Sequence, residues 1–158
     1  MSDVPWLDAE EERVWRSLVL LWRLGFLQLE RTFRQHGLIH LEYGVLAVLA
    51  ESDEGQLTAG QLAALTGLST SHLSHRLKNL ETKGLIARSP DAEDRRIVNI
   101  TVTNAGRRLV DEVAPAHVTD VRRLVFDHLR DDEVQVLAAS LGRLADRLGT
   151  FPPRRTPG

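Results

Sequence analysis

The sequence contains no cysteine and no long hydrophobic run, and each absence excludes a class of protein. Without cysteine, its 158 residues can form no disulfide, no thiolate zinc site, no catalytic thiolate and no thiol-based redox sensor. The longest apolar run covers six residues, 45–50, whereas a helix needs about 20 to span a bilayer. Residues 1–12 contain five acids and no basic residue, so we expect no secretory signal and a cytoplasmic protein without membrane contact.

A large net charge is also lacking, but the net charge of −2 conceals an uneven distribution. Residues 1–58 hold 5 basic residues against 10 acids, residues 59–108 hold 8 against 4, and residues 109–158 hold 7 against 8. The middle third therefore carries a net charge of +4 between acidic neighbours. Because local potential steers a polyanion to a surface, the total of −2 does not exclude nucleic acid. On charge alone, a solvated face is an equally good interpretation.

The composition is that of one globular domain, with 42% hydrophobic and 27% charged residues. Apolar residues from Val14 to Phe33 recur at helical spacing and predict a helix over about 8–36. Its apolar arc is wider than a small domain needs to cover, so this helix either lies deep in a core or packs against a second chain. Gly37 is expected to end it, and residues 41–50 are predicted to form a short buried helix.

Residues 57–83 have the pattern of two short helices joined by a glycine turn. Thr58 and Gln61 fit a capping box at the start of the first helix, and Gly67 suits a left-handed turn at its end. Ser69 is the predicted N-cap of a second helix that runs from 70 to about 83. The leucines of that helix form one stripe for burial, at positions 73, 77 and 80. Because its opposite face is short, polar and basic, the segment is a predicted helix-turn-helix.

Two short strands, 85–89 and 97–102, are predicted next, with the polar turn 90–96 between them. The second strand alternates, with Val98, Ile100 and Val102 expected to face inwards and Asn99 and Thr101 outwards. Two strands around a basic loop, directly after a helix-turn-helix, are typical of a winged helix.

Further helices are predicted after the strands. Thr103 is the expected N-cap of a helix that runs to about Val125, and Pro115 should kink or interrupt it. The acidic turn 131–133 suits the start of a last helix, whose leucines at 137, 141, 144 and 148 form an apolar seam. The expected fold class is mainly α with a small β-wing.

The run Leu77–Ile86, together with Asp94-Arg95-Arg96 and residues 97–107, resembles the MarR (multiple antibiotic resistance regulator) family of bacterial transcription factors. The family pattern there is Asp-x-Arg, a short strand and Leu-Thr-x-x-Gly-Arg, with Val102 here in place of the usual Leu. The resemblance implies a homodimer whose two recognition helices enter successive major grooves of a palindromic operator, about 34–36 Å apart.

The resemblance also suggests how the chain is organised within one structural domain. The expected parts are an N-terminal dimerisation helix (1–40), a winged helix-turn-helix (41–102), C-terminal dimerisation helices (103–149) and a flexible tail (150–158). Interleaving of the first helix and the last helices between subunits would account for the wide apolar arc of residues 8–36.

The helix that begins at residue 70 presents side chains that can approach DNA. Short polar residues at a helix N-terminus let the backbone come close to phosphates, and the helix dipole favours an anion there. Hydroxyl and imidazole groups can donate to or accept from base edges, and arginine can bind phosphate or guanine. The candidate contacts are Ser69, Thr70, Ser71, His72, Ser74, His75, Arg76 and Lys78. The alternative is an ordinary solvated face.

In the loop between the strands, the resemblance implies that Asp94 orients Arg96 and that Arg96 enters the minor groove. A narrow A·T-rich groove has an enhanced negative potential, which favours an inserted guanidinium. Arg95 is expected to contact phosphate. The alternative is a surface ion pair, which contributes little.

Relatives in this family bind small aromatic or anionic ligands between the dimer helices and the winged helix, which implies a possible pocket here. Its candidate residues are Trp22, Phe26, His36, His40 and Tyr43, for which a role as core aromatics is the alternative. His36 and His40 have a spacing that could hold a metal on a helix, but Gly37 is expected to break the helix between them. No metal and no cofactor are therefore predicted.

The sequence contains no catalytic grouping of nucleophile, acid and base, so an enzyme is not expected. The predicted function is a sequence-specific, homodimeric DNA-binding regulator, most simply a repressor that a small molecule releases. One alternative is a winged helix that serves as a protein-interaction module, which would more often expose apolar anchors. A metal-responsive regulator is the other alternative.

Overall fold

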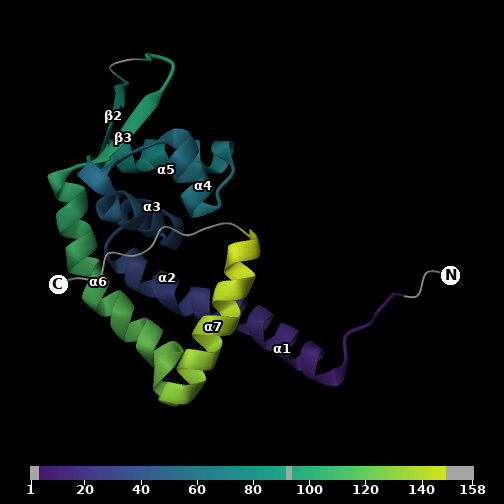
Figure 1. The fold of residues 1–158 in the computed structure, drawn as a ribbon. Coiled ribbons are helices and arrows are strands. Elements are labelled where there is room, and N and C mark those ends of the chain that lie inside the picture. Colours follow the sequence, from purple (N-terminus) through teal and green to yellow (C-terminus); the bar gives the residue numbers. More distant parts are fainter. Residues whose placement is uncertain (1–3, 92–93, 149–158) are drawn as a thin grey trace.

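The computed structural model describes residues 4–91 and 94–148 and shows a mainly helical chain with one small sheet, as predicted (Figure 1). The elements in chain order are α1 (Ala9–Leu20), η1 (Leu21–Gly25), α2 (Phe26–Gln35), α3 (His40–Glu51), η2 (Asp53–Gly55), β1 (Gln56–Thr58), α4 (Ala59–Thr66), α5 (Thr70–Thr82), β2 (Ile86–Pro90), β3 (Val98–Val102), α6 (Asn104–Leu124), η3 (Phe126–His128) and α7 (Asp131–Leu148). Figure 1 shows the β2–β3 hairpin at one end and α1 extending away from the body.

The predicted helix over 8–36 is present, but it contains a π-helical turn, η1, that the periodicity did not reveal. Asp8 begins the helix with a capping box, in which its carboxylate accepts from the Glu11 amide at 2.9 Å. At the end of η1, a Cβ on the buried Gly25 would lie only 2.9 Å from Leu124 Cδ2. A π-turn adds one residue, which rotates the helix before it by about 100° relative to the helix after it. Leu18 of α1 and Phe26 and Leu29 of α2 nevertheless line one cavity beside the end of α6.

The core is centred on α3, which packs against α2, α4, α5 and α6. Val45, Leu46 and Leu49 of α3 are completely buried, as is Phe33 of α2. Gly37, at a φ of +70°, ends the preceding helix as predicted. The prediction of a short buried helix over 41–50 is confirmed.

The helix-turn-helix forms as its local signals predict. Thr58 Oγ1 accepts from the Gln61 amide at 3.2 Å, and Gln61 Oε1 accepts from the Thr58 amide at 2.9 Å. Gly67 has a left-handed φ of +66° at the end of α4. Ser69 caps α5, whose buried residues are the three predicted leucines, 73, 77 and 80.

The sheet has three antiparallel strands in the order β1-β3-β2, although only two strands were predicted. Strand β1 is three residues long and pairs with β3 across more than 40 positions, Gln56 opposite Thr101. Such a short strand has no recognisable alternation, so the missed strand reflects a tertiary pairing. The two predicted strands are present, with β2 shifted by one residue from 85–89 and β3 starting one residue later than expected.

The predicted alternation in β3 is wrong at its first two residues. Val98 is 41% exposed, whereas Asn99 is only 9% exposed. Val98 pairs with Pro90 at the outer end of the hairpin, beyond the core. The Asn99 side chain is buried because its Nδ2 donates to Asp91 Oδ2 at 2.9 Å. The inner residues Ile100 and Val102 are buried as predicted.

Helix α6 runs from Asn104 to Leu124 with Pro115 inside it, so of the kink or interruption expected there, no interruption occurs. The missing N–H of Pro115 leaves the Asp111 carbonyl without its helical donor, but both residues lie on the exposed side, where that carbonyl can be hydrated. Thr103 caps the helix as predicted, since its Oγ1 accepts from the Gly106 amide at 3.1 Å. Helix α7 begins at the predicted acidic turn.

The two ends of the described chain contribute little to the core. Neither α1 nor α7 contains a buried residue, and both carry exposed leucines and valines. Within the described residues, no helix is long and apolar enough to cross a membrane. The predicted tail, 150–158, lies outside the described residues.

Candidate nucleic-acid interface

The first turn of α5 is fixed by the residues that precede it. The left-handed turn at Gly67 reverses the chain after α4, and Ser69 then adopts an extended conformation. Ser69 Oγ accepts a long hydrogen bond of 3.4 Å from the His72 amide, which leaves other amides of the first turn free to meet an acceptor. The buried leucine stripe holds the opposite face of the helix against the core.

The predicted contact residues of α5 lie on its outer face. All of them are exposed except Arg76, which is half-buried: Ser69, Thr70, Ser71, His72, Ser74, His75 and Lys78. The Nε atom of Arg76 is buried and has no hydrogen-bond partner within the part of the chain that the structure describes. Along the fully described stretch 69–91, no large hydrophobic side chain is exposed. The outer face of α5 therefore offers hydroxyls, imidazoles and cations, whereas the wing also exposes Ile97 and Val98, at 40% and 41%.

The wing places two exposed arginines, Arg95 and Arg96, at its turn. Asp94 Oδ1 accepts from the backbone amide of Arg96 at 2.9 Å, so Asp94 fixes the turn that carries the guanidinium. Asp91 Oδ1 accepts in turn from the Asp94 amide at 3.2 Å, while its other oxygen binds Asn99. The structural role of Asp91 was not predicted, although an Asp after proline at the start of a turn is a recognisable signal.

An ion pair ties the base of the wing to α5. Arg88 Nε of β2 lies 3.1 Å from Glu81 Oε2, near the end of α5. A cavity of about 210 Å³ lies beside this pair, and its lining includes Thr70, Ser74 and Val98. The ion pair and the shared cavity lining place the base of the wing beside α5.

Aromatic rings gather where α2, α3 and α6 meet, and they include three of the five predicted pocket residues. The Phe33 ring stacks on Tyr43 with centroids 4.7 Å apart and lies 5.2 Å from His117. His40 contacts Phe26 at 4.5 Å and Phe33 at 5.5 Å. We call Phe26, Phe33, His40, Tyr43 and His117 the aromatic cluster.

The other two predicted pocket residues lie at its margin or outside it. Trp22 makes an edge contact with Phe26 at 4.4 Å but is 68% exposed. Together with Phe26 it lines a cavity of about 310 Å³ between η1 and the end of α6. His36 points elsewhere, with its Nδ1 atom 3.2 Å from Glu112 Oε1.

Two members of the aromatic cluster, Phe33 and His117, were not predicted as pocket residues. Phe33 belonged to the apolar stripe of the first helix, and His117 is separated from it by 84 positions. Only the packing of α6 against α2 brings them together. No periodic or spacing signal in the sequence identifies such a contact.

The chemistry of the cluster is dominated by His40. Burial lowers the pKa of His40 below its ordinary value, and the nearby Glu30 carboxylate opposes this shift only in part. Glu30 Oε2 also accepts from the His40 backbone amide at 2.8 Å. Nδ1 of His40 is buried and has no hydrogen-bond partner among the described residues. The neutral imidazole is therefore the favoured form in the folded chain.

The described residues, 4–91 and 94–148, contain no group of three or more histidines and acids that could hold a metal ion. His36 and His40 are separated by the Gly37 turn, as predicted, and face different partners.

Comparison with known proteins identifies the fold and the family. A model of the MarR family matches residues 36–97. The chain is 30% identical over 148 residues to the HTH-type transcriptional regulator PecS of Dickeya dadantii. The matched region covers 93% of this chain and 89% of PecS. It is 24% identical to the HTH-type transcriptional repressor YetL of Bacillus subtilis over 92% of this chain and 86% of YetL. The match to YwaE of Bacillus subtilis, at 31% identity, spans 61% of this chain and only 56% of that relative.

Two solved structures from Streptomyces coelicolor are similar over almost their whole length. Sco3205, a MarR family regulator crystallised with DNA, is 34% identical with a TM-score of 0.87, covering 94% of each chain. AbsC, another MarR family regulator, is 32% identical with a TM-score of 0.85, covering 92% of this chain and 98% of AbsC. These relatives are transcriptional regulators and not enzymes. The chain therefore belongs to the MarR family and is a DNA-binding transcriptional regulator with a winged helix.

Proposed function

We propose that this regulator is a homodimer that represses transcription from a palindromic operator and is released by a small aromatic or anionic ligand. The observation that carries the proposal is the exposed polar face at the start of α5, together with the exposed Arg95 and Arg96 of the wing. The two features lie at one end of the molecule in Figure 1 and coincide with the basic third of the sequence.

Helix α5 is suited to the major groove. Ser71 and Ser74 are short, so the helix can approach the base edges closely. His72 and His75 then present ring nitrogens that can donate or accept there. Arg76 and Lys78 lie farther along the helix, where they can reach phosphates and fix the register. Base contacts from the first two turns and phosphate contacts from the next would together make binding sequence-specific.

The wing is suited to the adjacent minor groove. Arg96 is exposed, and its backbone is held by Asp94, so the guanidinium extends from an ordered turn. A narrow minor groove attracts such a cation because its potential is strongly negative. Arg95 faces solvent beside it and is positioned for the phosphate backbone.

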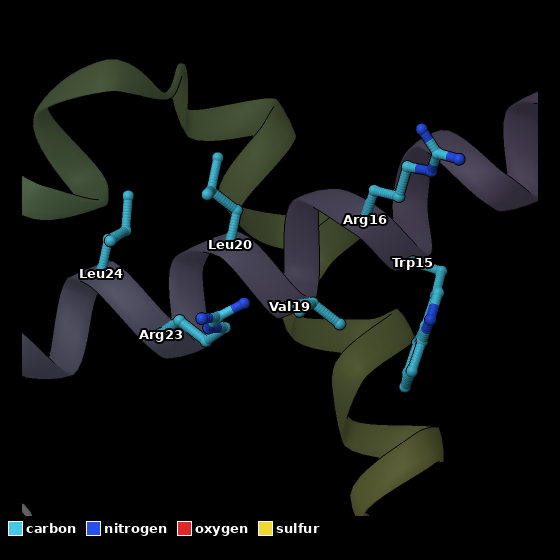
Figure 2. Close-up of a pocket in the computed structure, with 6 residues that line it drawn as sticks. All are labelled: Trp15, Arg16, Val19, Leu20, Arg23 and Leu24. Atoms are coloured by element: carbon cyan, nitrogen blue, oxygen red, sulfur yellow. The ribbon is translucent and has the colours of Figure 1, made fainter.

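The exposed apolar surface of α1 and α7 supports the homodimer. Leucines 137, 141, 144 and 148 of α7 are 39%, 44%, 54% and 91% exposed. A groove along α1 and η1 is lined by Trp15, Val19, Leu20 and Leu24, with Arg16 and Arg23 beside them (Figure 2). Exposed apolar surface of this extent is typical of an interface.

Repression and release are the finer parts of the proposal. YetL, a relative similar over most of the chain, is a transcriptional repressor. For release, the aromatic cluster joins α2 and α6 to α3, at the junction between the helices proposed for the dimer and the winged helix. A ligand wedged between these rings would alter the separation of the two α5 helices, so that they no longer match two half-sites.

The wing is tested by the variant Arg96→Ala on duplexes that the wild-type protein enriches from a random pool. Binding should weaken, and the slope of log affinity against log salt should become shallower by about one, because one fewer counterion is released. An unchanged affinity and slope would contradict the wing assignment.

The role of α5 as the recognition helix is tested by the variants Ser71→Ala and His75→Ala. Each should change the preference among single-base variants of the enriched duplex more than it changes affinity for random DNA. An equal loss on every duplex would reduce these residues to phosphate contacts.

A further inference from the structure

A buried carboxylate connects the core helix α3 with the far end of α5. Glu42, in the first turn of α3, is only 3% exposed. Its Oε2 atom accepts from Lys83 Nζ at 2.8 Å, and its Oε1 atom accepts from Asn79 Nδ2 at 3.3 Å. Both donors come from the last turn of α5, where Lys83 is the C-cap. Neither the DNA-facing residues nor the aromatic cluster accounts for this group.

The same lysine contacts the turn that precedes α3. Lys83 Nζ donates to the Gly37 carbonyl at 2.8 Å. One ammonium therefore binds the carboxylate of α3 and the backbone between α2 and α3, while its stem stays anchored to the end of α5. The almost fully buried Glu42 carboxylate would be strongly destabilised if it lost the Lys83 ammonium. Movement of the end of α5 away from Glu42 is therefore unfavourable.

We infer that Glu42, Asn79 and Lys83 form a clamp that sets the direction of α5, and that they are positioning residues for DNA binding. The inference rests on the proposed role of α5 as the recognition helix. Asn79 and Lys83 lie towards the opposite end of α5 from Ser69–His75, so the clamp would act on DNA binding through the direction of the helix.

The need for such a clamp arises from the length of the helix. Helix α5 has 13 residues, so its two ends are about 20 Å apart. A rotation of about 10° at the end of α5 would displace its first turn by about 3 Å, whereas hydrogen-bond distances vary by only about 0.5 Å. The leucine stripe holds α5 on the core through non-directional contacts, which tolerate sliding and rotation. The directional bonds to Glu42 remove that freedom.

The test compares Lys83→Met and Glu42→Gln with Lys83→Arg and a matched control, Arg34→Met. Arg34 pairs with Glu30 at 3.3 Å on the exposed side of α2, so its removal changes the net charge by the same amount as Lys83→Met without touching α5. For each variant, affinity is measured on a wild-type-enriched duplex and on random DNA at one salt concentration. Thermal unfolding confirms that each variant is folded at the temperature used.

We expect the ratio of specific to random affinity to fall about tenfold in Lys83→Met and Glu42→Gln. Lys83→Arg, which keeps a cationic donor, should recover most of that ratio, and Arg34→Met should leave it unchanged. A variant that is less stable but still folded should keep the wild-type ratio of specific to random affinity. If both clamp variants keep the wild-type ratio, the inference is wrong.

Hydrogen exchange separates failure of the clamp from failure of the proposed function. Backbone amides of α5 should exchange faster in Lys83→Met than in Arg34→Met, whereas amides in the middle of α6 should not. If wild-type protein prefers no duplex, the proposed function fails. In that case, unchanged exchange in α5 would overturn the clamp as well, and faster exchange confined to α5 would support it.

Discussion

Gly106 is the residue at which the wing and the helix α6 make their closest approach. A Cβ at this position would lie 2.2 Å from the Leu85 carbonyl oxygen and 2.8 Å from Val102 Cγ2. Two further bonds join the same elements, from the Thr103 amide to the Leu85 carbonyl at 3.0 Å and from Thr103 Oγ1 to the Gly84 carbonyl at 2.8 Å. The first turn of α6 is therefore seated directly on the backbone that enters β2.

Gly106→Ala should lower the free energy of unfolding by about 2–3 kcal/mol, because the methyl group meets backbone that cannot move aside. Urea denaturation followed by circular dichroism measures this change. The matched control is Gly60→Ala in α4, where a Cβ meets nothing within 4 Å. Alanine there should raise the free energy of unfolding by up to about 1 kcal/mol. Equal effects of the two substitutions would contradict the close approach.

His40 makes stability depend on pH. Since burial lowers the pKa of His40 in the folded chain, the unfolded chain binds a proton at pH values where the folded chain does not. The contribution of His40 is therefore fully present above its ordinary pKa of about 6.5 and is lost as the pH falls through the lower folded value.

His40→Phe keeps a ring against Phe26 and Phe33 but cannot bind a proton. Its free energy of unfolding should decline less than that of the wild type between about pH 7.5 and about pH 5.5, measured by urea denaturation at each pH. The other five histidines are common to both proteins, so the difference isolates His40. Parallel declines would show that His40 titrates alike in the folded and unfolded chains.

Single-residue signals were predictable from the sequence where their partners are local. The caps at Thr58, Ser69 and Thr103 each bind an amide three residues away, and all three predictions are confirmed. Glu42 could not be assigned a partner in this way, because Lys83 is 41 positions distant. The roles of the DNA-facing residues could be predicted only in part. Their types and helical face could be predicted, while their contacts with DNA remain a prediction.

At the scale of elements, helices were predicted more completely than strands. The helical stripes are long and periodic, whereas β1 has three residues and depends on β3 for its existence. Helix α6 continues through Pro115 because the affected carbonyl lies on the exposed side of α6. The π-turn η1 was missed because one extra residue in a wide apolar arc hardly disturbs the pattern.

The π-turn has a consequence for the proposed dimer. Deletion of Arg23, an exposed residue of η1, should restore the α-helical repeat and rotate α1 by about 100° relative to α2. The apolar face of α1 would then turn away from the second copy of the chain. The dimer should therefore dissociate at concentrations at which the wild type is dimeric. Sedimentation velocity measures this shift. The length-preserving control Arg23→Ala should stay dimeric, and a deletion variant that also stays dimeric would contradict the role of η1.

At the scale of the whole molecule, one chain divides its surface between two tasks. The winged helix carries the basic, polar end, and α1 and α7 carry apolar residues that one chain leaves exposed. The net charge of −2 is the sum of an acidic body and a middle third of +4. The boundaries of the dimerisation helices, 1–40 and 103–149, remain a prediction.

The proposed homodimer on a palindromic operator is tested by the symmetry of the DNA that the protein selects. Purified protein would be used to enrich duplexes from a random pool, and the enriched sequences would be aligned. For the proposed homodimer we expect an inverted repeat whose half-sites have centres about one helical turn, 10–10.5 base pairs, apart. Enrichment of a site without two-fold symmetry, or no enrichment over the starting pool, would contradict it.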